Sequence, residues 1–182
     1  MSEKENKPGL LLHICCAGCG VYVSELLAAE FQITLFFYNP NINPETEYRL
    51  RLTDVIKVSE YLKIPVINGG YDHDRWLKLI TGNEKEPERG KRCAICYEDR
   101  IAETAREAVR RRIGHFATTL SVSPHKVATL ISEIGRRVAR DNGLEFYDRD
   151  FKKNDGFKKS TVLARQLSLY RQNYCGCEFS HR

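Results

Sequence analysis

The chain has 182 residues, with 29 lysines and arginines against 24 aspartates and glutamates, so its net charge of +5 is only moderately basic. This length fits one domain, residues 1–182, whose core is large enough to need no cross-links. Residues 1–9 are mostly polar and charged, and no apolar run approaches the roughly 20 residues that span a bilayer. We therefore expect a soluble, cytoplasmic protein with no membrane partner.

Apolar runs and turn residues predict alternating strands and helices along the chain. Short β-branched or aromatic runs predict strands at residues 10–14, 32–38, 65–68, 115–120 and 144–147. Helical spacing and helix-start signals predict helices at residues 21–30, 44–63, 72–80, from 93 onward, 123–142 and 161–173. This alternation is typical of a doubly wound parallel sheet with helices on both faces, of the Rossmann-like or HUP-like class. A cysteine-containing tail follows the last helix.

Seven cysteines fall into three tight groups, which are Cys15-Cys16-x-x-Cys19, Cys93-x-x-Cys96 and Cys175-Gly176-Cys177. In the cytoplasm thiols stay reduced, so grouped cysteines more often bind metal or perform redox chemistry than form structural disulfides. Any one of them can also be a small buried apolar residue, but three clusters favour metal ligation or dithiol chemistry. In a doubly wound sheet the ligand site lies beside the carboxyl end of the first strand, where Cys15 and Cys16 follow residues 10–14.

The first two groups together supply a four-thiolate ligand set. Cys93 and Cys96 lie where a loop enters a helix, so both sulfurs face one side of a turn and the helix amides stabilise thiolates. With Cys15 and Cys16 they suit either zinc or a [4Fe-4S] cluster. Adjacent cysteines favour the cluster, because it offers separate irons to neighbouring sulfurs. Cys19 is either an alternative ligand or a packing residue.

The Cys175-Gly176-Cys177 group is different, because a disulfide across a single glycine closes a small, strained ring. Such a disulfide is easily reduced, which makes it a poor structural link and a good two-electron relay. The alternatives are a second metal clip and two unpaired surface thiols.

Basic residues concentrate in the second half of the chain, which indicates a polyanionic partner such as RNA. The segment 151–159 interleaves the cations Lys152, Lys153, Lys158 and Lys159 with Phe151 and Phe157, as phosphate contact plus base stacking requires. The alternative is an exposed lysine-rich loop before a helix cap at Ser160. Further arginines cluster at 110–112, 136, 137 and 140. Those at 110–112 follow acidic residues along one predicted helix, so they also fit a solvated helix face.

Five segments of the chain form a recognisable combination. They are His13-Ile14-Cys15-Cys16-Ala17-Gly18-Cys19, Cys93-Ala94-Ile95-Cys96-Tyr97, the segments 118–126 and 150–157, and the tail from Leu169 to Ser180 with Tyr174-Cys175-Gly176-Cys177-Glu178-Phe179-Ser180. Together they resemble the QueH family of epoxyqueuosine reductases. Gly18 stands where this family usually has proline, which predicts a more flexible loop.

The resemblance implies a tRNA-modifying reductase that removes the epoxide oxygen of epoxyqueuosine at the wobble position of tRNA, without cobalamin. It implies an iron–sulfur site, with room for an additional iron, and a redox-active pair. The partners are then tRNA and an electron donor. In these roles Cys15, Cys16, Cys93 and Cys96 bind the cluster, and Cys175 and Cys177 hold the electron pair. His13, Asp72 and Asp74 are candidate proton donors that fit structural or capping roles better.

Two other functions fit parts of the pattern. One is a zinc-stabilised RNA-binding module without catalysis, in which the Cys-x-Cys tail is a further ligand arm. The other is a tRNA-thiolating ATP pyrophosphatase of the PP-loop type, whose fold would look alike. The first loop argues against it, because bulky thiols stand where ATP phosphates would approach backbone amides.

Overall fold

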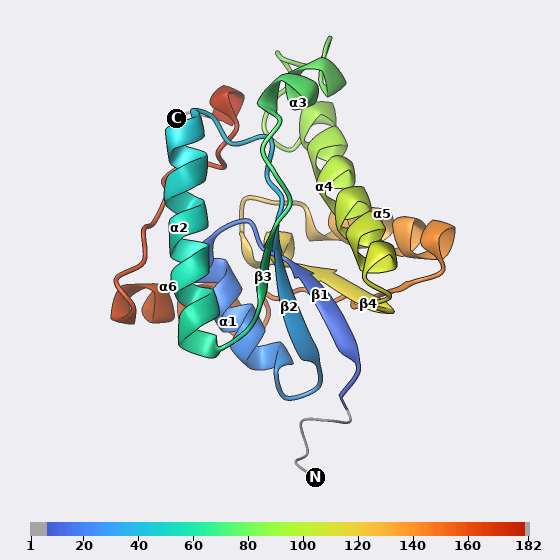
Figure 1. The fold of residues 1–182 in the computed structure, drawn as a ribbon. Helices are drawn as coiled ribbons and strands as arrows, with labels where there is room; N and C mark the ends of the chain where they lie inside the picture. The colour runs from blue at the N-terminus through green and yellow to red at the C-terminus, as the bar shows by residue number, and fades with distance from the viewer. Residues whose placement is uncertain (1–6, 181–182) are drawn as a thin grey trace.

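The computed structural model describes residues 7–180, which form a five-stranded, all-parallel sheet of order β3-β2-β1-β4-β5 (Figure 1). The strands are β1 (Gly9–His13), β2 (Gln32–Phe37), β3 (Val66–Asn68), β4 (His115–Thr118) and β5 (Glu145–Phe146). The helices are α1 (Ala17–Leu27), α2 (Glu45–Leu62), α3 (His73–Leu79), α4 (Lys91–Arg110), α5 (Ala128–Asn142) and α6 (Gly156–Gln166), with 3₁₀ helices η2 (Thr119–Val122) and η3 (Glu178–Ser180). The predicted doubly wound fold is confirmed.

Two layers of helices bury the two faces of the sheet. Leu10 and Leu12 of β1 pack with residues of α1, α2 and α6, whereas Leu11 packs with residues of α4 and α5. Successive side chains of a strand point to opposite faces, so a run of three leucines serves both layers. Figure 1 shows α1, α2 and α6 on one side of the sheet and α4 and α5 on the other. None of the helices within residues 7–180 is long and apolar enough to cross a membrane.

The strand predictions are confirmed to within a few residues, but three helix boundaries were wrong. Helix α1 begins at Ala17 rather than residue 21, and α5 begins at Ala128 rather than residue 123, because residues 119–122 form η2 and 123–127 a loop. Gly18 therefore lies in the first turn of α1 and not in a flexible loop. A Cβ atom there would lie 3.1 Å from the Cβ of Ala164, so Gly18 allows α6 to pack closely on α1.

Helix α6 covers residues 156–166 instead of the predicted 161–173. Asp155, with a φ of 60°, turns the chain into the helix, and a Cβ at Gly156 would come within 1.8 Å of the Phe151 carbonyl oxygen. Only glycine fits this contact, which therefore sets the start of α6. Ser160 lies inside the helix and donates a hydrogen bond to the Phe157 carbonyl, so the predicted cap was wrong. Lys158 and Lys159 consequently lie in the first turn of α6.

The central strands are joined by His13, which is completely buried. Its ring nitrogens lie 2.9 Å from Thr118 Oγ1 and 3.0 Å from the carbonyl oxygen of Tyr38. Burial lowers the pKa of His13 to about 4, so the ring is neutral near pH 7. Asp72 accepts a hydrogen bond from the Arg75 amide as the N-cap of α3. Both residues thus have the structural or capping roles that the sequence favoured.

Candidate functional site

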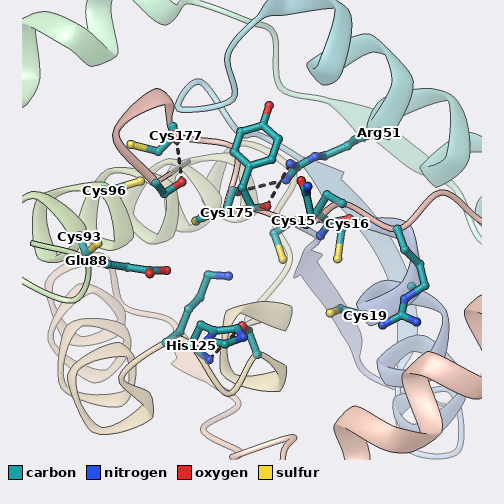
Figure 2. A pocket seen from close by; sticks show the side chains of 18 of the residues that line it. Cys15, Cys16, Cys19, Arg51, Glu88, Cys93, Cys96, His125, Cys175 and Cys177 are labelled. Carbon is teal, nitrogen blue, oxygen red and sulfur yellow. Dashed lines mark hydrogen bonds between the residues drawn. The ribbon is translucent and has the colours of Figure 1, made fainter. Parts of the chain in front are cut away.

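A single pocket of about 290 Å³ is lined by all seven cysteines (Figure 2). Cys15 and Cys16 follow β1, Cys19 lies in α1, Cys93 and Cys96 lie in the first turns of α4, and Cys175 and Cys177 belong to the tail after α6. The pocket lies at the carboxyl edge of the sheet, where the parallel topology predicts a ligand site. The structure therefore brings together the three groups that are far apart in the sequence.

The donor set suits a metal–thiolate group. Iron–sulfur clusters and structural zinc ions are bound in proteins by cysteine sulfurs, and here such sulfurs lie on two sides of one pocket. Within residues 7–180, no group of three or more histidine, cysteine, aspartate or glutamate side chains is arranged to hold a single metal ion. All seven cysteines are free thiols.

Cys15 is the most acidic of the thiols after β1. Its pKa lies well below the ordinary value, first because the Cys16 and Cys19 thiols hydrogen-bond to it, and also because Lys126 and Thr119 stabilise the thiolate. The same contacts raise the pKa of Cys16 to about 11 and that of Cys19 well above its usual value. Thr119 also accepts a hydrogen bond from the Cys15 amide at 3.2 Å. This loop therefore presents one thiol with a lowered pKa flanked by two thiols whose pKa values are raised.

The second wall of the pocket is the start of α4. The backbone N–H of Arg89 donates to Cys93 Sγ at 3.3 Å, and the Arg92 guanidinium donates to the Glu84 carbonyl at 2.7 Å. These bonds hold the charged loop before α4 around the helix start. Cys96 is buried in an apolar cluster with Trp76, and burial raises its pKa to about 11.

Helix α2 anchors the Cys-Gly-Cys tail, which runs alongside it in Figure 1. Arg51, 3% exposed, pairs with Glu47 and donates hydrogen bonds to the carbonyl oxygens of Cys175 at 3.1 Å and Tyr174 at 3.3 Å. The Gly176 carbonyl accepts a hydrogen bond from the amide of residue 43 at 2.8 Å. Cys177 packs in the same apolar cluster as Cys96, and burial raises its pKa to about 12.

Two cations face the thiols from the pocket wall. Burial opposes the positive charges of Arg100 and Lys126, yet electrostatic attraction to the facing sulfurs outweighs this effect, chiefly to Cys96 and Cys175 at Arg100 and to Cys175 and Cys15 at Lys126. The pKa of each cation is therefore raised above its ordinary value. Neither residue was selected from the sequence as part of the site. The only signal for Arg100 is its place four residues after Cys96, on the same helix face.

The predicted RNA-binding lysines belong to a segment from which Phe157 and Ser160 line the pocket. Lys153, Lys158 and Lys159 are exposed and have no side-chain partner among residues 7–180, whereas Lys152 Nζ donates to the Lys126 carbonyl at 3.4 Å. Phe157 lines the pocket and is 41% exposed. The expectation that Phe151 stacks on a base was wrong, because Phe151 is 2% exposed and packs in the core between the sheet and α6.

Most of the clustered arginines are paired with acidic residues. Arg110 and Arg111 bind Glu107, and the pairs Arg136–Asp148 and Arg137–Glu98 link α5 to its neighbours. The pairs of Arg110 and Arg111 fit the solvated helix face that the sequence offered as an alternative for residues 110–112. Within residues 7–180, Lys152, Lys153, Lys158 and Lys159 form no ion pair, so their charges differ from those of the paired arginines.

Comparison with solved structures first defines the class of fold. The U34-tRNA thiolase NcsA from Methanococcus maripaludis, solved with its [4Fe-4S] cluster, aligns with a TM-score of 0.53 at 13% identity, over 98% of this chain and 63% of that chain. At this identity the likeness concerns the fold alone. The protein is therefore an α/β protein with a doubly wound sheet and a thiol-lined pocket at its carboxyl edge.

Sequence comparison then identifies the family. The family model described as "Epoxyqueuosine reductase QueH" matches residues 10–182. Similar proteins named epoxyqueuosine reductase QueH come from Streptococcus pyogenes serotype M1, Acinetobacter baylyi and Thermotoga maritima. Their sequences are 35%, 36% and 35% identical to this chain, respectively. The alignments cover 98%, 98% and 94% of this chain and 72%, 83% and 89% of the relatives. The chain belongs to the epoxyqueuosine reductase QueH family, a family of oxidoreductases.

Gly176 provides a test of how the tail is held. Its φ is 112°, and a Cβ atom there would lie 2.8 Å from Ile42 Cγ1. We expect Gly176→Ala to release the tail, because strain of this kind costs about 1–3 kcal/mol. Alkylation of Cys177 by iodoacetamide in the native protein, followed by mass spectrometry, should become about tenfold faster or more.

Gly70→Ala is the matched control, because Gly70 also has a positive φ, of 86°, but nothing lies within 4 Å of its Cβ position. Equal alkylation rates at Cys177 in the two variants would contradict the anchoring of the tail through Gly176.

Proposed function

We propose that the chain reduces epoxyqueuosine to queuosine at the wobble position of tRNA. The observation that carries this proposal is the convergence of seven thiols in one pocket, in a chain of this family. Removal of the epoxide oxygen takes two electrons and two protons and releases an alkene and water. In this proposal residues 1–182 act as one catalytic domain in the cytoplasm, with tRNA and an electron donor as partners.

The ligand set that we propose is Cys15, Cys16, Cys93 and Cys96, holding a [4Fe-4S] cluster. Two of these thiols come from the end of β1 and two from the start of α4, so the set spans the pocket. When bound, the cluster supplies electrons singly, and an iron with an open position is a Lewis acid toward the departing oxygen. Cys19 is the fifth thiol beside this set, and the proposal allows an additional iron there. It needs no cobalamin.

Cys175 and Cys177 are the proposed redox pair. Oxidation of the dithiol forms one S–S bond and releases two electrons and two protons, which match the demand of epoxide removal. The small ring across Gly176 makes the disulfide oxidising, so an external thiol or electron carrier can reopen it. Support comes from the position of the pair, because both thiols line the pocket beside Cys96.

The proposed RNA contact is the start of α6 with the turn before it. Lys152, Lys153, Lys158 and Lys159 provide positive charge for phosphates beside the pocket, and Phe157 provides an exposed ring at its wall. A base within an anticodon loop must leave its stack to reach a pocket of this kind. In this arrangement the tRNA phosphates contact the lysines outside the pocket, while the base enters the pocket.

The cluster ligands can be tested by substitution with serine. After anaerobic purification the wild-type protein should contain iron and acid-labile sulfide, and Cys93→Ser should lower both and bleach the broad visible absorption, because a ligand is lost. Cys19→Ser is the matched control and should have a milder effect. Full, stable loading of Cys93→Ser would remove Cys93 from the set, whereas zinc without sulfide in the wild type would favour the RNA-binding module.

The redox pair can be tested with Cys177→Ala. This variant should keep its iron and still bind tRNA, yet stall after at most one turnover, because a single thiol cannot store two electrons. Single-turnover and multiple-turnover assays on tRNA carrying epoxyqueuosine measure the difference. Loss of a metal ion from the variant, together with no 175–177 linkage in the wild type by mass spectrometry, would make the pair a metal clip instead.

The RNA surface can be tested through salt dependence. Replacing Lys152, Lys153, Lys158 and Lys159 by glutamine should weaken tRNA binding and flatten its dependence on salt, because each lost phosphate contact removes roughly 0.9 or less from the log–log slope. Turnover at saturating tRNA should survive. The comparison variant replaces Arg110, Arg111, Arg136 and Arg137. If the salt dependence of its tRNA binding flattens more than that of the lysine variant, the RNA surface lies on α4 and α5 instead.

A further inference from the structure

Arg100 is a buried cation whose charge no carboxylate balances. It lies in α4, one turn after Cys96, and is 1% exposed. Its Nε donates to the Cys96 carbonyl at 3.2 Å and its Nη1 to Asn39 Oδ1 at 3.4 Å. Within residues 7–180, Nη2 has no hydrogen-bond partner and the guanidinium forms no ion pair.

Other arginines of the same helix show how unusual this is. Arg106 is half exposed and pairs with Glu103, and Arg110 pairs with both Glu103 and Glu107. Arg92 is buried, but its guanidinium donates to carbonyl oxygens of the preceding loop. A buried charge without a counter-charge is unfavourable, so its retention calls for an anion that the fold itself does not supply.

The position of Arg100 indicates where such an anion would lie. The side chain lines the thiol pocket and is hydrogen-bonded to the backbone at Cys96. On its other side Asn39, which is completely buried, accepts from Arg100 and donates through Nδ2 to the Ile14 carbonyl at 3.0 Å, next to Cys15. The guanidinium thus connects the two chain segments that carry the four proposed ligands.

We propose that Arg100 is the internal counter-ion of the metal–thiolate group held by Cys15, Cys16, Cys93 and Cys96. This inference rests on the proposed function and assigns Arg100 a positioning and electrostatic role. A cluster with four thiolates is anionic and gains one more negative charge on reduction. A cation buried beside it stabilises the reduced form more than the oxidised form, because interactions between charges are strong where water is excluded. Arg100 therefore raises the reduction potential of the bound group.

The test is a redox titration of reconstituted protein with dithionite, monitored by electron paramagnetic resonance. Arg100→Met, which keeps much of the length but not the charge, should lower the midpoint by at least 59 mV, the one-electron equivalent of a tenfold change. Arg100→Lys keeps the charge and should restore most of the potential. Arg106→Met is the matched control from the same helix and should leave it unchanged.

Urea unfolding of the cluster-free proteins provides a second measurement. Arg100→Met should unfold at the same urea concentration as the wild type or a higher one, because it removes an uncompensated buried charge. If cluster-free Arg100→Met is less stable than cluster-free Arg106→Met, then Arg100 is a structural residue and the inference is overturned. An iron-loaded Arg100→Met protein with an unchanged midpoint would overturn it as well, while the proposed function would stand.

Wild-type protein that takes up no iron and sulfide would instead overturn the proposed cofactor, and this inference with it. Iron content of the wild type thus separates the failure of the proposed function from the failure of the role given to Arg100.

Discussion

The parallel pairing of β1 between β2 and β4 is the constraint on which the pocket depends. His13 pairs in register with Phe36 on one side and Thr118 on the other, and its buried ring bonds to Thr118 and to the Tyr38 carbonyl. Because all strands run in one direction, the loops that follow them meet at one edge. Cys15 after β1 and Thr119 after β4 therefore come into hydrogen-bond contact, although 104 residues separate them. Helix α4 and the tail complete the pocket from outside the sheet.

Charge in the pocket follows from burial. The thiols of Cys96 and Cys177 lie in apolar surroundings that keep them protonated, whereas Cys15, supported by its neighbours and by Lys126, is the one thiol with a lowered pKa in the group after β1. Arg100 adds a positive charge that no carboxylate pairs with among residues 7–180. The protein alone thus leaves an excess of buried positive charge beside protonated sulfurs, and thiolates bound to a metal group would reverse that balance.

The sequence predicted the fold and the contents of the pocket better than the helix ends. Alternating strands and helices imply one parallel topology, and this topology brings residues 15 and 93 to one edge. Residue 175 is held there by contacts of the tail with α2. The start of α6 was predicted wrongly because it depends on the contact of Gly156 with the Phe151 carbonyl, which the local spacing of residues does not reveal. Phe151 was misplaced for the same reason. Arg100 resembles the exposed arginines of α4 in sequence, and only its burial against Cys96 and Asn39 distinguishes it.

The anchoring of the tail limits which part of it would move during the proposed thiol–disulfide cycle. Arg51 holds the carbonyl of Cys175, and Asp54 of the same helix accepts a hydrogen bond from the Tyr170 amide, so the segment before Gly176 is tied to α2. Cys177 is held differently, by apolar contacts with Cys96 and Trp76 and by two hydrogen bonds from Ser180 to its carbonyl. Apolar contacts have no fixed direction, whereas the bonds of Arg51 do. Both Ser180 bonds lie within the tail, so the Cys177 side can rearrange without breaking the bonds from Arg51, and Cys175 is the fixed member of the pair.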